Sequence, residues 1–327
     1  MIIKLKWVVI FQAVAIVLLL ALSVNLYYQH TKIKSGFNVN GLLSTRIYSG
    51  LLEPKSFLIV NFAPLKTELN EYIKSNDVNV SIYVENLRNG AYMGIDERTG
   101  FFPGSLNKLP IAILIMKQVE EGKLSMDTML EIKDSDRTDS SGELYKTKDT
   151  SLPLEVVMEK MLKESDNTAL RVLLRYIDLN DLQFMLDYYG LDISVDYGRD
   201  HVDLITPKAM SGLFLSLYFS TVLEPKNSEY LLSLPTETDF NIKEIAGINE
   251  NVVIAHKFGV HYYSGNRYFH DCGIIYIDEK RVFYCIMTKD LEEDKAVATM
   301  GFALNRIYTY MKDTDSLLGS YRKNQQG

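Results

Sequence analysis

The sequence contains a serine and a lysine at a spacing that could form an activated nucleophile. In the stretch FFPGSLNKLPIAILIMK, Ser105 and Lys108 stand three residues apart at the start of a strongly apolar segment. Pro103 and Gly104 interrupt the chain just before them, as is common where a helix begins. On a helix, positions i and i+3 share a face, so the Lys108 amine can lie beside the Ser105 hydroxyl. A serine with a neighbouring base suits covalent catalysis, although an ordinary helix-capping serine has the same local pattern.

Two further motifs follow in the order that would complete such a site. The tripeptide SDN at residues 165–167 lies between two expected helices, which predicts a tight turn. The tripeptide KFG at residues 257–259 lies in an apolar stretch typical of a strand. The order S-x-x-K, S-D-N, K-x-G, on a helix start, an inter-helix turn and a strand, resembles the serine β-lactamase and penicillin-recognising family. The resemblance is nearest to class A members and covers about residues 65–311.

The resemblance implies a role for each motif. Ser105 would attack an amide carbonyl, with Lys108 as its base. Ser165 would relay a proton to the leaving nitrogen, and Lys257 would support Ser165 and a substrate carboxylate. The positions implied to hold the substrate are Asn167, Gly259 and Val260. Backbone N–H groups of Ser105 and Val260 would form the oxyanion hole.

Two departures from the family pattern bear on the reaction. The third motif normally has Thr or Ser at its centre, and Phe258 removes that hydroxyl, which puts recognition of a substrate carboxylate in doubt. Class A members carry a Glu-x-x-Leu-Asn loop whose glutamate activates the deacylating water, but residues 191–205 contain no glutamate. Four aspartates in that segment are interpreted as loop-stabilising or solvated: Asp192, Asp196, Asp200 and Asp203. The pattern therefore does not provide for fast deacylation.

We expect a class A β-lactamase-like serine hydrolase that opens the β-lactam amide through a Ser105 acyl-enzyme. Two alternatives use the same acylation chemistry: a D-alanyl-D-alanine peptidase acting on cell-wall peptides, and a non-catalytic penicillin-binding sensor. The missing glutamate favours these alternatives, whereas the class A-like lengths between motifs favour the hydrolase. The expected partner is thus a small β-lactam or a D-Ala-D-Ala peptide, with no cofactor.

The N-terminal segment predicts a membrane anchor. Lys4 and Lys6 precede residues 7–26, an almost uninterrupted apolar run that is long enough to cross a bilayer. The basic flank keeps the N-terminus cytoplasmic and predicts a single-pass protein of the cell membrane with an extracytoplasmic catalytic domain. A cleaved signal peptide is the alternative. The run is longer than a typical signal core and lacks a clean A-x-A site, so we favour an uncleaved anchor.

The remaining pattern predicts the organisation of the chain. Strand signals at both ends of the body enclose a helical block, with no strand signal at residues 127–210. We therefore expect an α+β fold in which an antiparallel sheet is flanked by terminal helices and carries an inserted all-helical lobe. The predicted parts are a transmembrane anchor at 1–30, an extracytoplasmic spacer at 31–62, the hydrolase domain at 63–312 and a polar tail at 313–327.

Charge and histidine spacing argue against two other classes of function. The net charge of -7 disfavours a nucleic-acid surface. His256, His261 and His270 cluster around the third motif, but their spacing fits no zinc pattern, so no metal site is expected.

Cys272 and Cys285 stand at equal distances from an expected turn at residues 278–279. A two-residue hairpin loop there would place the two cysteines directly opposite each other. An extracytoplasmic location permits a disulfide, and a pair of buried free thiols is the open alternative.

Overall fold

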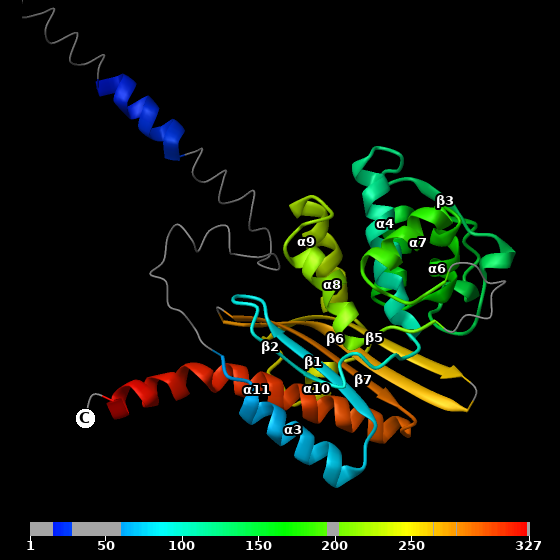
Figure 1. Cartoon of the computed structure of the whole chain (residues 1–327). Helices are drawn as coiled ribbons and strands as arrows, with labels where there is room; N and C mark the ends of the chain where they lie inside the picture. The colour runs from blue at the N-terminus through cyan, green and yellow to red at the C-terminus, as the bar shows by residue number, and fades with distance from the viewer. Residues whose placement is uncertain (1–15, 28–59, 195–202, 264, 279, 326–327) are drawn as a thin grey trace, which may run out of the picture.

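The computed structural model describes residues 16–27, 60–194, 203–263, 265–278 and 280–325. Its body is organised around a five-stranded antiparallel sheet (Figure 1). In spatial order the strands are β2 (Tyr92–Ile95), β1 (Val80–Asn86), β7 (Lys280–Lys289), β6 (Asn266–Ile277) and β5 (Val253–Tyr263). Because successive side chains in a strand point to opposite faces, the sheet separates two hydrophobic cores.

Helices from both ends of the domain cover one face of the sheet (Figure 1). They are α3 (Ala63–Asn76) and α11 (Glu293–Gln325). The short α10 (Ile242–Ile245) packs beside α11 on the same face. The helix α11 packs on β6 and β7 through apolar side chains at helical spacing, all fully buried: Met300, Leu304, Ile307 and Met311. This stripe attaches the C-terminal helix to the centre of the sheet.

The other face carries α8 (Pro207–Tyr218) and the helical lobe (Figure 1). Thr206 caps α8 by accepting a hydrogen bond from Ala209 N at 3.0 Å, and Pro207 occupies the first turn. The lobe helices are α4 (Lys108–Glu120), α5 (Leu154–Leu162), α6 (Asn167–Leu174), α7 (Leu179–Tyr188) and α9 (Pro225–Ser233). The helix α4 runs through the lobe and is buried along most of its length, as its nearly continuous apolar sequence predicts.

The expected α+β architecture with terminal helices on an antiparallel sheet is confirmed. The lobe, however, is not all-helical, because β3 (Met129–Glu131) and β4 (Ser151–Pro153) form a two-stranded sheet within it. Strands of three residues are too short to show an alternating pattern, so neither strand could be predicted from its residues. The terminal helix also continues to Gln325, through most of the predicted polar tail.

Among the described residues, no helix has the length and apolar character needed to cross a membrane. Of the predicted anchor at residues 1–30, only residues 16–27 are described, and they are helical. Apart from residues 60–62, the predicted spacer lies outside the described residues.

The hairpin of β6 and β7 pairs the two cysteines. Ile277 faces Lys280 where the two strands meet, and the register then sets Cys272 opposite Cys285. The two residues are joined by a disulfide with their Cα atoms 3.9 Å apart, and both are fully buried. The bond therefore connects the two strands at the centre of the sheet, on the face toward the lobe.

Candidate active site

A glycine turn presses the candidate nucleophile against the sheet. Ser105 lies in a 3-10 turn, η1 (Gly104–Asn107), that leads directly into α4. Gly104 adopts φ +51°, and a Cβ there would lie 2.7 Å from the Val260 carbonyl oxygen. Gly259 makes a similar approach, since a Cβ there would lie 3.0 Å from the Pro103 carbonyl oxygen. Two glycines thus permit backbone contact between the nucleophile turn and β5.

The Ser105 hydroxyl is not used as a helix cap. Neither η1 nor α4 has a side-chain capping hydrogen bond, so the capping interpretation of the motif is not what the structure shows. Instead, the Ser105 Oγ accepts a hydrogen bond from Lys108 Nζ at 3.1 Å. The serine hydroxyl and the lysine amine therefore meet as their spacing predicts.

Lys108 lies at the centre of a polar cluster inside the protein. Only 1% of its surface is exposed, and its Nζ also donates to Ser165 Oγ at 3.1 Å and to the Ser165 carbonyl oxygen. Burial, together with the positive charge of Lys257, lowers the Lys108 pKa to about 7 against the opposing effect of Asp166. A substantial fraction of the amine is consequently neutral near pH 7 and can accept a proton.

The second motif is held in place by its own aspartate. Ser165 adopts a left-handed conformation at φ 56°, which directs its side chain and carbonyl toward Lys108. The fully buried Asp166 caps α6 by accepting from Ala169 N and also accepts from Leu144 N, each at 2.8 Å. Asp166 is therefore a structural carboxylate.

The third motif adds a second buried lysine. Lys257 is 2% exposed, and its Nζ donates to Ser165 Oγ at 3.0 Å. Burial lowers its pKa to about 8, while the carboxylates of Asp271 and Asp239 oppose that decrease. Ser165 consequently lies between two lysine amines, one on α4 and one on β5. One chain of hydrogen bonds thus runs from Ser105 through Lys108 and Ser165 to Lys257. It connects residues more than 150 positions apart in the sequence.

A cavity of about 270 Å³ opens beside this chain of hydrogen bonds. Residues from all three motif regions line it: Phe102, Pro103, Gly104, Ser105, Asn107, Asn167, Leu170, Asp203, Val260 and His261. Asn167 donates from Nδ2 to Ser140 Oγ at 2.8 Å, which orients its amide at the rim. The predicted positions Asn167 and Val260 therefore border the cavity, and Gly259 packs behind it against the nucleophile turn.

Phe258 turns away from the cavity and into the opposite core. Its ring stacks on Phe240 at a centroid distance of 3.7 Å, among the side chains that α10 and α11 cover. The aromatic ring at the centre of the third motif thus has a packing role. Phe240 could not be identified from the sequence as its partner, because the two residues are brought together only by the fold.

The histidines near the third motif serve separate local contacts. His256 shares a hydrogen bond of 2.7 Å with the buried Asp271, His261 stacks on Phe102 at 5.0 Å, and His270 bonds to the Phe102 carbonyl oxygen. Within the described part of the chain, no group of three or more His, Cys, Asp or Glu residues is arranged to hold a metal ion.

One aspartate of the loop that lacks glutamate reaches the cavity. Asp203 lines it, and its Oδ1 accepts a hydrogen bond from Ser194 N at 3.0 Å. Asp192 lies at the other end of the loop, where its carbonyl oxygen accepts from Leu204 N at 2.7 Å. Asp196 and Asp200 lie outside the described residues. Asp203 was not distinguishable from its three neighbours by sequence alone.

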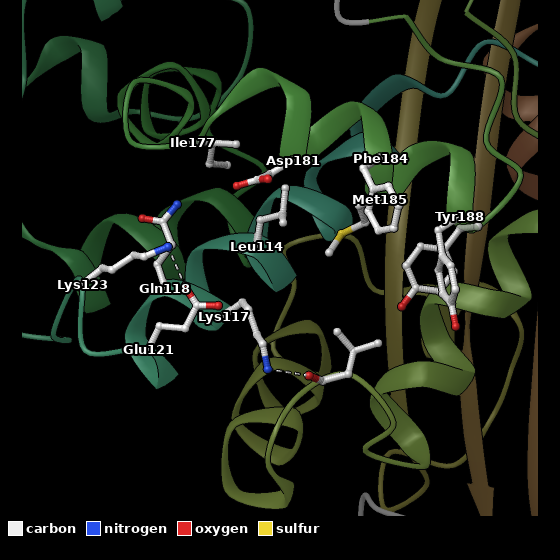
Figure 2. Close-up of a pocket in the computed structure, with 12 residues that line it drawn as sticks. Leu114, Lys117, Gln118, Glu121, Lys123, Ile177, Asp181, Phe184, Met185 and Tyr188 are labelled. Atoms are coloured by element: carbon white, nitrogen blue, oxygen red, sulfur yellow. Dashed lines mark hydrogen bonds and ion pairs between the residues drawn. The ribbon is translucent and has the colours of Figure 1, made fainter.

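A larger cavity of about 540 Å³ lies elsewhere, between α4 and α7 (Figure 2). Its walls combine apolar side chains such as Leu114, Phe184 and Met185 with the aliphatic stems of lysines. None of the motif residues lines it. Of these two cavities, only the smaller one borders a serine that is hydrogen-bonded to a lysine with a lowered pKa.

Comparison with known proteins shows what the chain as a whole is similar to. A sequence profile described as the β-lactamase enzyme family matches residues 64–311. The β-lactamase VEB-1 of Pseudomonas aeruginosa is 23% identical over 212 residues, which cover 60% of this chain and 71% of VEB-1. The structure of the extended-spectrum β-lactamase TLA-3 aligns with a TM-score of 0.70 at 18% identity, covering 77% of this chain and 100% of that one. The structure of PBP-A aligns with a TM-score of 0.67 at 21% identity, covering 77% and 97% respectively.

The electrostatic coupling of the two lysines can be measured. In Lys257→Met the positive charge facing Lys108 is removed, so the Lys108 pKa should rise above about 7. Nuclear magnetic resonance of the lysine amines across a pH series would report this shift. Lys163→Met, which removes a lysine that pairs with Glu237 at the surface, serves as the control. A Lys108 pKa that is unchanged in Lys257→Met would contradict the coupling.

Proposed function

Since the chain belongs to the β-lactamase enzyme family, we propose that it is a serine hydrolase that opens the β-lactam amide through an acyl-enzyme on Ser105. The observation that carries this proposal is the buried amine of Lys108, 3.1 Å from both the Ser105 and the Ser165 hydroxyl oxygens. Its pKa of about 7 makes a neutral amine available to take the Ser105 proton.

In the proposed acylation, Ser105 Oγ loses its proton to Lys108 Nζ and attacks the lactam carbonyl carbon. The negative charge that develops on the carbonyl oxygen is stabilised by the backbone N–H groups of Ser105 and Val260. The glycine turn supports this arrangement, because it brings the Ser105 backbone close to β5. The tetrahedral adduct then collapses, and the carbon–nitrogen bond breaks.

The leaving nitrogen requires a proton, and the geometry provides a short path for it. Lys108 Nζ and Lys257 Nζ both donate to Ser165 Oγ, at 3.1 and 3.0 Å. Ser165 can pass its proton to the nitrogen while Lys108 returns the one taken from Ser105. The positive charge of Lys257 also attracts a substrate carboxylate. Phe258 supplies no hydroxyl to assist it.

The specific test is covalent labelling by a fluorescent penicillin together with turnover of a chromogenic cephalosporin. Ser105→Ala should lose labelling completely, because no other nucleophile borders the cavity next to a lysine amine in the described residues. Since Ser105 makes no capping hydrogen bond, the thermal midpoint of this variant should stay near that of the native protein. Labelling that persists at another residue would refute the assignment.

A penicillin-binding role with slow release is the second candidate. Its support is the cavity wall, where the one lining carboxylate among the described residues, Asp203, belongs to the loop that lacks the family's glutamate, and one of its oxygens is already bonded to Ser194 N. A variant of PBP-A has been solved as an acyl-enzyme complex with penicillin G. A D-alanyl-D-alanine peptidase or a sensor would use the same acylation chemistry.

Without a well-placed general base, deacylation should be slower than acylation, since such assistance typically contributes roughly 10²–10⁴-fold. Penicillin labelling should therefore appear as a burst that decays slowly. Any residual turnover should decrease by about tenfold or more in Asp203→Asn, on the same general-base scale. Asp192→Asn, in the same loop but outside the cavity lining, is the matched control. Rapid turnover that survives both substitutions would place the base elsewhere.

We also propose that the N-terminal segment remains attached and anchors the protein in the cell membrane, with the hydrolase domain outside. The support is the apolar run at residues 7–26 and the two lysines that precede it. The full chain should fractionate with membranes, whereas a variant that begins at residue 29 should not. A mature N-terminus beyond Ser23, found by mass spectrometry of the extracted protein, would instead indicate a cleaved signal peptide.

A further inference from the structure

The segment that carries the nucleophile is fixed to its surroundings at several points. We name residues 101–105 the nucleophile strap. At its first residue, Phe101 exchanges two backbone hydrogen bonds with Ile205, both 2.8 Å long. Further along, the backbone of Gly104 in the strap touches β5 at Val260, and the backbone of Gly259 in β5 touches the strap at Pro103. The steric contacts at the two glycines limit how closely the strap approaches β5, but they do not prevent the strap from moving away from it.

A buried histidine supplies an attractive contact at the middle of the strap. His270 of β6 is fully buried, and its Nε2 lies 2.7 Å from the Phe102 carbonyl oxygen, three residues before Ser105. Because a carbonyl oxygen can only accept, the ring carries its proton on Nε2 and donates it. The ring also packs edge-on against Phe101, at a centroid distance of 5.6 Å and an interplanar angle of 82°.

The place of His270 in the sheet connects the strap to the oxyanion region. His270 pairs directly with Gly259 in the register of β5 and β6, so both residues lie on the sheet face that also presents Lys257. The residue that follows Gly259 is Val260, whose carbonyl oxygen faces Gly104. One strand pair therefore presents both the histidine that holds the strap and the residue expected to donate the second oxyanion N–H.

His270 suits this task because it donates without adding charge. Burial lowers its pKa to about 4, against the opposing effect of its hydrogen bond to Phe102. The ring is therefore neutral throughout the pH range in which Lys108 and Lys257 change charge. A lysine or arginine at this position could make the same hydrogen bond, but its permanent charge would further lower the pKa of both lysines.

We propose that His270 is a positioning residue for acylation: its hydrogen bond to the Phe102 carbonyl sets the distance of the strap from β5. That distance determines whether the N–H groups of Ser105 and Val260 converge on one carbonyl oxygen. Displacement of the strap by about 1 Å is enough to lower a reaction rate by about 10²-fold. The inference rests on the proposed acylation of Ser105.

The test compares three variants in the fluorescent-penicillin assay, with the limiting acylation rate and the apparent dissociation constant measured separately. His270→Leu keeps the apolar volume but removes the donor, and its limiting rate should decrease by about 10- to 100-fold with little change in the dissociation constant. His270→Gln carries an amide N–H at nearly the reach of Nε2 and should restore the rate to within about threefold. Thr288→Val is the control, because it removes a buried hydrogen bond next to His270 in the chain, to Phe269 O, on the sheet face away from the strap.

Two results would overturn the proposal: a native limiting rate in folded His270→Leu, or an equal loss of rate in His270→Leu and Thr288→Val. If His270→Leu does not fold, His270→Met, which also lacks a donor, takes its place under the same criteria.

Hydrogen exchange separates this inference from the proposed function. Amides of residues 101–107 should exchange faster in His270→Leu than in the native protein or in His270→Gln, whether or not the protein reacts with penicillin. If penicillin never labels the native protein, the acylation proposal is refuted. The exchange rates then still show whether His270 holds the strap in position. Equal exchange in all variants would reject the positioning role.

Discussion

The site depends on a lysine amine kept inside the protein between two serines. A Lys108 pKa of about 7 in place of 10.5 corresponds to a penalty of about 5 kcal/mol on the charged form. The fold sustains this burial because the amine has three acceptors around it, Ser105 Oγ, Ser165 Oγ and the Ser165 carbonyl. Without these partners, the buried amine would be an uncompensated polar group instead of an available base.

The two halves of the molecule each supply part of that environment. The lobe provides Lys108 on α4 and Ser165 in the turn before α6, while the sheet provides Lys257 on β5. The positive charge of Lys257 lowers the tendency of Lys108 to be charged, because two ammonium groups close together repel in a medium of low polarity. At Lys257, the carboxylates of Asp271 and Asp239 oppose the effect of burial, and the pKa is about 8, against about 7 for Lys108. The order of the two values leaves one amine largely charged and the other available as a base.

Much of the local structure was predictable from the sequence because it has local causes. The apolar run after Lys108 correctly indicated a helix, and the residue count between Cys272 and Cys285 correctly indicated an opposed pair. The three motifs were recognised in the correct kinds of element for the same reason. The short strands β3 and β4 were missed, because their pairing partners lie about 20 residues apart and leave no periodic signal.

The sequence by itself determined which side chains could do chemistry: a serine and a lysine one helical turn apart, a capped turn at SDN and a lysine on a strand. The tertiary structure alone decided that the cavity of about 270 Å³ includes Asp203, that Phe258 stacks on Phe240, and that His270 reaches the Phe102 carbonyl. The division follows from the range of the interactions. Helix periodicity and capping act between residues a few positions apart, whereas burial, pKa shifts and contacts such as that between His270 and Phe102, 168 positions apart, arise only when distant segments pack together.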